Sequence, residues 1–337
     1  MQNSKFAFSV LATATALTLA ACGGGGGDDG GSKQEPSTPT TPTVPQAPTS
    51  VPPATTVSAP SYPSGDLRLA AFNALSDYRI KMGVGALKQD TALDVAADNH
   101  VAYLKANSAV GHDETAGKPG FTGATPYEQG VAAGASKDQW ISQAADGSIG
   151  CLADFRNSVY HLQGITSNQE TIGLSIRDGY CVMNFGVKTG ANGSGYGLPQ
   201  WGGQQMATNA FAYSPIDAES VPGTFTATAE SPSPAPDLPS AGHPVMFRVP
   251  APNASDVLTV SNFILTGPAG NAVPARVLVA SAAKPSSVAS AISDPYVYSG
   301  VAFLLPTQPL SAGTYTATFA GARNGVAISK SWSFTVY

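Results

Sequence analysis

Charged side chains are scarce in this chain of 337 residues, where Lys, Arg, Asp and Glu together make up 12% and the formal net charge is −5. A nucleic-acid partner requires clustered Lys and Arg to neutralise its phosphates, and the 17 basic residues here are not clustered. Long apolar runs are also lacking after Cys22, so we expect no membrane-spanning helix there and a soluble remainder. The composition therefore argues against a nucleic-acid partner and against an integral membrane protein.

Residues 1–21, in contrast, predict a secretory signal peptide. Lys5 provides a short positive region, and the apolar run from Phe6 to Leu19 is broken only by Ser and Thr. This run is shorter than the roughly 20 residues that a membrane-spanning helix needs. The segment Leu19-Ala20-Ala21-Cys22 resembles the lipobox of bacterial lipoproteins. The resemblance implies acylation of Cys22 and anchoring to a bacterial membrane, facing the periplasm or the cell surface. An ordinary signal peptide cut near Ala21 is the alternative.

Cysteine is rare as well, with three residues, Cys22, Cys151 and Cys181. If Cys22 carries lipid, the other two form an even pair in an oxidising compartment. A bridge between them would close a loop of about 30 residues and contribute roughly 3–4 kcal/mol. We therefore predict a Cys151–Cys181 disulfide. Two buried free thiols or half of a metal site are the alternatives, although no CxxC or CxxH spacing supports a metal site.

Residues 22–62 are rich in Gly, then in Ser, Thr and Pro, with almost no large apolar side chain. Such a segment cannot bury enough apolar surface to offset the entropy lost on ordering, so we predict a disordered linker. Its Pro-rich part should be extended and semi-rigid. The linker would hold the folded part of the chain away from the lipid surface.

Residues 63–190 have the pattern of a mixed α/β domain. Apolar residues at three- and four-residue spacing predict a helix that begins near Asp66, and a second helix for which Asp90 is the N-cap. Two strands joined by a tight turn are predicted at 172–176 and 180–185.

The remainder of the chain divides into two parts. Residues 191–240 are rich in Gly and Pro and lack periodicity, which predicts an irregular connecting segment. From 241 to 337 apolar residues alternate with a period of two, and Asn324-Gly325 is typical of a type I′ hairpin turn. About seven short strands in about 95 residues predict an all-β sandwich.

Two of the four histidines are candidates for a site. His100 lies near the end of the apolar stripe of the second predicted helix, so we expect it to be a packed structural residue, and His243 has no evident role. His112 follows Gly111 in a glycine-rich loop, and His161 ends the motif Asn157-Ser158-Val159-Tyr160-His161.

The order and spacing of these motifs resemble the CAP superfamily, also called the SCP-like or Tpx-1/Ag5/PR-1/Sc7 fold, over about residues 66–187. The resemblance implies an α/β fold class, with an α-β-α sandwich domain preceding the C-terminal all-β sandwich. The matching positions are Asn73, Arg79, Gly83, Leu87, Asp90, Leu93, Ala97, His100, Gly111-His112, Asn157–His161 and Ile172-Gly173-Leu174.

In that family two histidines and two acidic residues line a central cleft and can hold a divalent metal, often zinc. The resemblance assigns the histidines to His112 and His161, and it puts Gln139 where a Glu is expected. Asp154 is the candidate for the second acid, and Glu114 and Glu128 are other substitutes. A Gln brings no negative charge to a cation and cannot act as a general base. We therefore expect at most a weak zinc site at the two histidines and no required cofactor.

The sequence thus predicts an exported, membrane-anchored and non-catalytic binding module. Lipids, small amphiphiles, proteins and cell-wall material are the ligands that the resemblance suggests. The alternative is a metal-assisted or His-based hydrolase that uses His112 and His161, although neither a GxSxG nor an HExxH motif supports it. A structural envelope protein with a vestigial cleft is a third interpretation.

Overall fold

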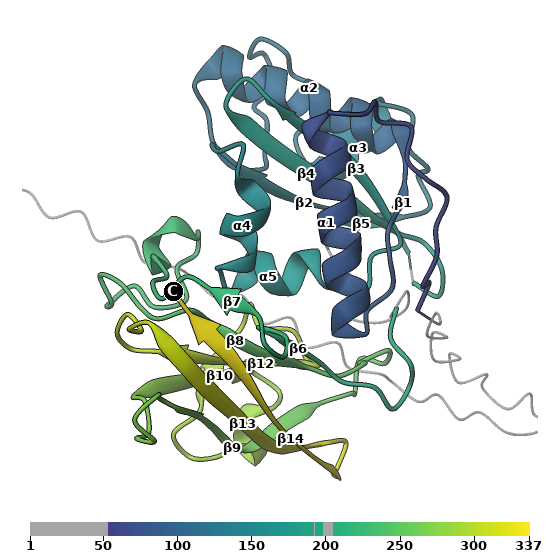
Figure 1. Cartoon of the computed structure of the whole chain (residues 1–337). Helices are drawn as coiled ribbons and strands as arrows, with labels where there is room; N and C mark the ends of the chain where they lie inside the picture. Colours follow the sequence, from purple (N-terminus) through teal and green to yellow (C-terminus); the bar gives the residue numbers. More distant parts are fainter. Residues whose placement is uncertain (1–52, 192, 198–204) are drawn as a thin grey trace, which may run out of the picture. The chain divides into compact units, whose positions relative to one another are not determined.

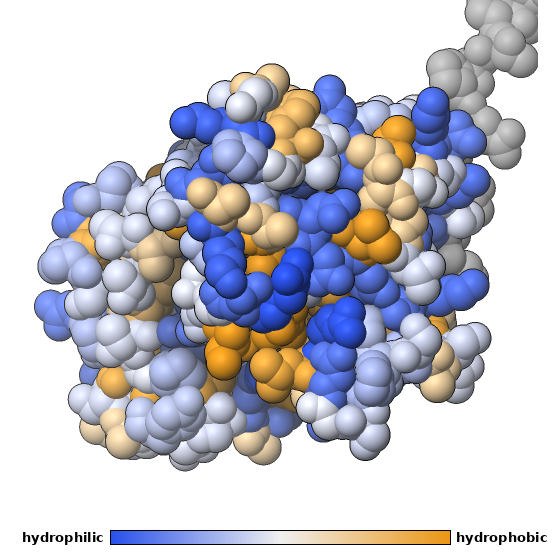
Figure 2. Space-filling model, turned by 90° about the horizontal axis from the view of Figure 1, so that it is seen from above, coloured by the Kyte–Doolittle hydropathy of each residue, from blue (hydrophilic) through white to orange (hydrophobic). Residues whose placement is uncertain are grey.

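The computed structural model describes residues 53–191, 193–197 and 205–337, all within one compact unit, Gln46–Tyr337. The predicted signal peptide, the lipid-attachment residue Cys22 and most of the predicted linker lie outside the described residues. Within the described ranges, no helix has the length and apolar character needed to cross a membrane. On the face shown in Figure 2, apolar side chains occur in small groups between hydrophilic ones.

The N-terminal part of this unit is built on a five-stranded sheet in the order β1-β3-β4-β2-β5 (Figure 1). Its central strands β3 and β4 are the predicted antiparallel pair, and Asp178 and Gly179 both adopt positive φ in the turn between them. Strand β2 was not expected from the sequence. The five strands are β1 (Lys88–Gln89), β2 (Trp140–Asp146), β3 (Thr171–Arg177), β4 (Tyr180–Val187) and β5 (Gly195–Tyr196).

The two long helices begin where their capping residues predict. The carboxylate of Asp66 accepts a hydrogen bond from the backbone N–H of Arg68, and that of Asp90 accepts from Ala92 and Leu93. The helices of this part are α1 (Leu67–Met82), α2 (Thr91–Asn107), α3 (Pro126–Ala132), α4 (Cys151–Arg156) and α5 (Tyr160–Ile165).

These helices cover both faces of the sheet. On β4, Cys181 and Met183 belong to an apolar cluster with side chains of α1, α4 and α5, whereas Val182 belongs to a cluster with α2. This division follows from the alternation of side chains along a strand. The predicted three-layer α-β-α sandwich is therefore confirmed.

The predicted disulfide joins two of these layers. Cys151 at the start of α4 is bonded to Cys181 on β4, with Cα atoms 6.0 Å apart. Both residues are buried in the same apolar cluster. The bridge fixes α4 to the middle of the sheet, next to the helix that carries His161.

The C-terminal part is a sandwich of two sheets, in the orders β11-β10-β12-β8-β6 and β7-β14-β13-β9. Between the sheets the rings of Phe247 and Phe319 stack with centroids 3.8 Å apart. Asn324 and Gly325 have positive φ between β13 and β14, as a type I′ turn requires. The strands are β8 (Val245–Arg248), β9 (Leu258–Thr266), β10 (Ala275–Ala280), β11 (Ile292–Asp294), β12 (Val301–Pro306), β13 (Gly313–Arg323) and β14 (Val326–Val336).

The connecting segment is more regular than its sequence suggests. It contributes β5 to the first sheet, and β6 (Ala212–Ser214) and β7 (Ser220–Val221) to the two C-terminal sheets. Each strand has only two or three residues, too few for a period-two pattern to be visible in the sequence. Short 3₁₀ helices occur at Ala227–Ala229 and Lys284–Ser286.

One apolar cluster spans the two parts of the unit. It contains Tyr78 of α1 and Leu162 of α5 together with Met246, Phe303 and Leu305 of the C-terminal sheet. All five side chains are buried. The α-β-α layers and the sandwich therefore share a hydrophobic core.

His243 has no evident role in the sequence, but its burial predicts how the stability of the fold depends on pH. Its side chain is buried, and burial lowers its pKa from 6.5 to about 3. In the unfolded chain the ring gains a proton below about pH 6.5, whereas the folded protein keeps it neutral down to about pH 3. His243 therefore does not reduce the free energy of unfolding above pH 6.5. Below that pH the free energy of unfolding decreases as the pH falls, by about 1.4 kcal/mol per pH unit.

We expect His243→Leu to flatten this decrease, and urea unfolding between pH 7 and pH 4 measures it. His112→Leu is the comparison and should flatten the decrease less, because burial also lowers the pKa of His112 but its hydrogen bond to Gln143 opposes this effect. Equal pH slopes for wild type and His243→Leu would contradict the prediction.

Candidate functional site

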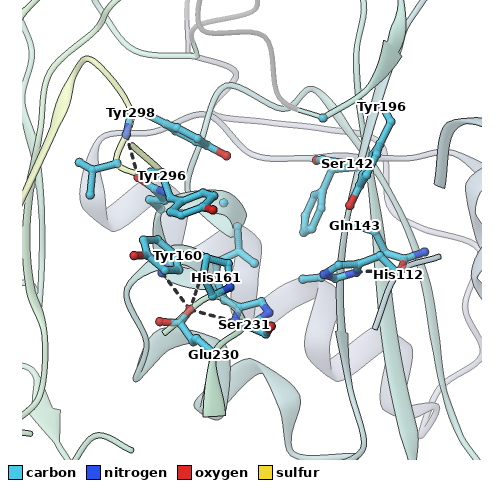
Figure 3. Close-up of a pocket in the computed structure, with 18 of the residues that line it drawn as sticks. His112, Ser142, Gln143, Tyr160, His161, Tyr196, Glu230, Ser231, Tyr296 and Tyr298 are labelled. Atoms are coloured by element: carbon cyan, nitrogen blue, oxygen red, sulfur yellow. Dashed lines mark hydrogen bonds and ion pairs between the residues drawn. The ribbon is translucent and has the colours of Figure 1, made fainter. Parts of the chain in front are cut away.

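A cavity of about 350 Å³ brings together residues that are distant in the sequence. Its walls come from β2, α5, β5, the connecting segment and the loop between β11 and β12. Both predicted histidines line it, His112 from the loop after α2 and His161 from α5. Figure 3 shows the two rings on opposite sides of the cavity. Their joint presence in one site is what the resemblance implied.

The loop that carries His112 is held by buried hydrogen bonds of His100 and Glu114. The Nδ1 atom of His100 lies 3.0 Å from Oε1 of Glu114, and its Nε2 lies 3.0 Å from the carbonyl oxygen of Gly111. The other oxygen of Glu114 accepts hydrogen bonds from the backbone N–H groups of Thr122 and Gly123. His100 therefore has the structural role that the sequence predicts. Glu114 closes the loop and does not serve as a cleft acid.

The partner of His112 is a neutral amide. Nδ1 of His112 lies 3.0 Å from Oε1 of Gln143 on β2, and the Gln143 amide donates in turn to Asn184 on β4. Burial lowers the pKa of His112, and the proximity of His161 lowers it further, against the opposing effect of the Gln143 hydrogen bond. The ring is therefore kept neutral at pH 7.

The partner of His161 is a carboxylate to which no motif in the sequence points. Oε1 of Glu230 lies 3.0 Å from Nδ1 of His161 and also accepts from the N–H groups of Tyr160 and His161, while Oε2 accepts from Val159. The helix α5 has no side-chain N-cap of its own. Glu230 therefore satisfies its first N–H groups and orients the imidazole at the same time.

Two buried arginines bind the other end of α5. Arg248 of β8 donates to the carbonyl oxygens of Gln163 and Thr166, and Arg79 of α1 donates to that of Ile165. Burial lowers the pKa of Arg79 to about 9 and that of Arg248 to about 10, so both remain charged at pH 7. An acid at the start of the helix and cations at its end are the favourable arrangement for its backbone dipoles.

Gln139 does not occupy the position that the sequence assigned to it. It is buried against Gly186 of β4, outside the residues that line the cavity. Gln143, four residues later, lies beside His112 instead. The chain pairs with β4 along β2, and this pairing turns Gln143 toward the cavity.

The two other acidic candidates lie outside this cavity. Glu128 forms a capping box with Thr125 at the start of α3, so its carboxylate is used by the helix. Asp154 lines an adjoining hollow of about 340 Å³, together with His161 and Asp146. Burial and the neighbouring Asp154 raise the pKa of Asp146.

The donor set does not fit the zinc ion that the resemblance suggests. Among the residues that the structure describes, no group of three or more His, Cys, Asp or Glu side chains lies close enough together to hold a metal. His112 faces an amide, and the oxygens of Glu230 are already used by four N–H groups. Structural and catalytic zinc sites need three or four N, S or O ligands.

The fold and the two histidines of the cavity define the class of protein as an SCP-like α-β-α sandwich followed by an all-β module. Residues 72–185 match the family model of CAP, the cysteine-rich secretory protein family, so this part of the chain is a CAP domain. No curated protein matches the chain significantly.

Two solved structures are similar to the chain. One is an extracellular SCP-domain protein of Bacillus anthracis, with 17% identity and a TM-score of 0.31, over 38% of this chain and 44% of that one. The other is an outer surface protein of Borrelia burgdorferi, with 16% identity and a TM-score of 0.31, over 39% of this chain and 99% of that one.

The position of Gln143 predicts how the affinity of the cavity for zinc could be raised. In Gln143→Glu a carboxylate replaces an amide oxygen that lies 3.0 Å from Nδ1 of His112, and we expect zinc affinity to increase by about tenfold or more. The affinity should fall below about pH 6, where histidines gain protons. Calorimetric titration with zinc measures both effects.

Gln139→Glu is the matched control, since it adds the same charge outside the cavity. A comparable gain in zinc affinity for Gln139→Glu, or no gain for Gln143→Glu, would show that the assignment of Gln143 is wrong.

Proposed function

We propose that this protein is exported, anchored to a bacterial membrane through lipid on Cys22, and binds a small ligand in the CAP-domain cavity without converting it. The N-terminal pattern and the lipobox-like Leu19–Cys22 support export and anchoring. The Cys151–Cys181 disulfide is consistent with an oxidising compartment. Lipids, proteins and cell-wall material are the classes of ligand that the family resemblance suggests.

The binding function is supported mainly by the hydrogen bonds that Glu230, the carboxylate at the cavity, already makes. Glu230 uses both oxygens to accept from the backbone of Val159, Tyr160 and His161 and from the His161 ring. His112 is paired with an amide. Among the described lining residues no carboxylate is therefore free to act as a general base or to bind a metal, whereas the cavity volume is within the usual range for small ligands.

A His-based hydrolase remains the second candidate because of one observation. The pairing of His161 Nδ1 with Glu230 resembles the orientation of a general base by a carboxylate. However, in the described part of the chain no Ser, Thr or Cys side chain is hydrogen-bonded to this imidazole, so the nucleophile that such a pair would activate is missing. The binding function is therefore the better supported.

Filling the cavity tests this proposal. Gly164 of α5 lines the cavity, and a Cβ atom added there meets no atom within 4 Å. We expect Gly164→Trp to fold normally and to abolish co-purification of the small molecules that accompany the wild type from its native host. Mass spectrometry of denatured, extensively washed protein detects them.

The matched control is Ala153→Trp, an exposed position of α4 outside the cavity. It should retain the same molecules as the wild type. Identical mass spectra for wild type and Gly164→Trp would contradict binding in this cavity.

Anchoring is tested separately at Cys22. In Cys22→Ser the thiol that accepts the lipid is absent, so we expect the protein to leave the membrane fraction or to accumulate unprocessed. Fractionation of cells followed by immunoblotting measures this. Cys151→Ser serves as the control for loss of a cysteine, and its membrane association should be retained. Unchanged processing and membrane association of Cys22→Ser would exclude the lipid anchor.

A further inference from the structure

Aromatic side chains form two walls of the cavity described above. Tyr296, from the loop between β11 and β12, is 53% exposed, and Tyr196, on β5, is 43% exposed. Figure 3 shows Tyr196 on one side of the cavity and Tyr296, with Tyr160 and Tyr298, on the other. The ring of Tyr296 is held in position by Tyr160, against which it packs edge-on with centroids 5.6 Å apart. Two partly exposed and positioned aromatic faces are thus available to a ligand.

The polar groups between these walls carry little available charge. Among the described lining residues there is no Lys, Arg or Asp, and the only carboxylate is that of Glu230, whose oxygens already accept from four N–H groups. The remaining polar side chains are amides, hydroxyls and imidazoles, which can both donate and accept hydrogen bonds. An ionic ligand such as a phosphate or an ammonium group would find no free counter-charge here.

An acyl chain is also poorly matched to this lining. Ile165 and Val297 are the branched aliphatic side chains among the described lining residues, which also include Ala144, Phe185, Pro232 and Pro295 beside four tyrosines and several polar groups. A lipid tail entering the cavity would therefore remove polar groups from water without replacing their hydrogen bonds, which is costly. A ligand with both an apolar face and many hydroxyl groups avoids this cost.

We propose that the cavity binds an uncharged sugar ring of an oligosaccharide, stacked on Tyr296 and Tyr196. The C–H faces of a pyranose ring pack on the negative faces of aromatic rings, and its hydroxyls match the Gln143, Ser142 and Ser231 side chains that line the space. This inference rests on the proposed binding function and specifies the class of ligand. It also gives the C-terminal sandwich a part in recognition, because Tyr296 belongs to it.

The test uses the mature full-length chain and defined probes. These are uncharged tetramers of β-1,4-linked N-acetylglucosamine, β-1,4-linked glucose and α-1,4-linked glucose, with a sulfated heparin tetramer and palmitate for comparison. We expect at least one uncharged tetramer to bind in calorimetry. Tyr296→Ala should weaken this binding by about tenfold or more, whereas Tyr296→Phe, which keeps the aromatic face, should retain most of it. Tyr337→Ala, at a tyrosine that is 73% exposed and outside the cavity, is the matched control and should bind as the wild type does.

The outcomes separate this inference from the function on which it rests. Palmitate or heparin binding that Gly164→Trp abolishes, without binding of any uncharged tetramer, overturns the sugar proposal and leaves the binding function intact. Equal tetramer affinities of wild type, Tyr296→Ala and Tyr337→Ala also overturn it. If no probe binds, the sugar proposal is wrong, and the co-purification experiment alone decides the binding function.

Discussion

The carboxylate of Glu230 makes the contact on which the site depends. It accepts three backbone N–H groups at the start of α5 and the ring N–H of His161. Without it, a six-residue helix would begin with unsatisfied donors, of which that of Val159 is buried and would cost about 1–3 kcal/mol. Arg248 makes the complementary contact at the other end of α5. The position of a CAP-domain histidine is thus fixed by two residues that lie after the CAP domain in the sequence.

Those parts of the fold that depend on local rules could be predicted from the sequence. Asp66 and Asp90 as caps, the turn at Asp178-Gly179 and the Asn324-Gly325 hairpin each depend on neighbours a few residues away. Strand β2 could not, because Trp140–Asp146 contains two alanines and a single β-branched residue, and its conformation is set by pairing with β4. The resemblance therefore pointed to Gln139, whereas the pairing of β2 with β4 places Gln143 beside His112.

Only some residues of the candidate site could be predicted from the sequence. His112 and His161 belong to motifs that can be compared with a family. Glu230 and Tyr296 lie 69 and 135 residues beyond His161, in segments without a motif, and only the packing of the tertiary structure brings them to the cavity. No pattern in the sequence predicts such contacts, because their cause is the shared core of Tyr78, Leu162 and Phe303 rather than any local preference.

The structural unit that forms the candidate site is therefore larger than the CAP domain. Residues 72–185 supply both histidines and Gln143, yet the acid that orients His161 and the most exposed aromatic wall come from residues 230 and 296. An isolated domain would expose the apolar surface of α1 and α5 that now packs on the sandwich, and it would lose the polar contacts at both ends of α5. The shape of the cavity and the stability of α5 thus depend on the same contacts. A change in the sandwich near Arg248 or Tyr296 will consequently affect the cavity even though it lies outside the family match.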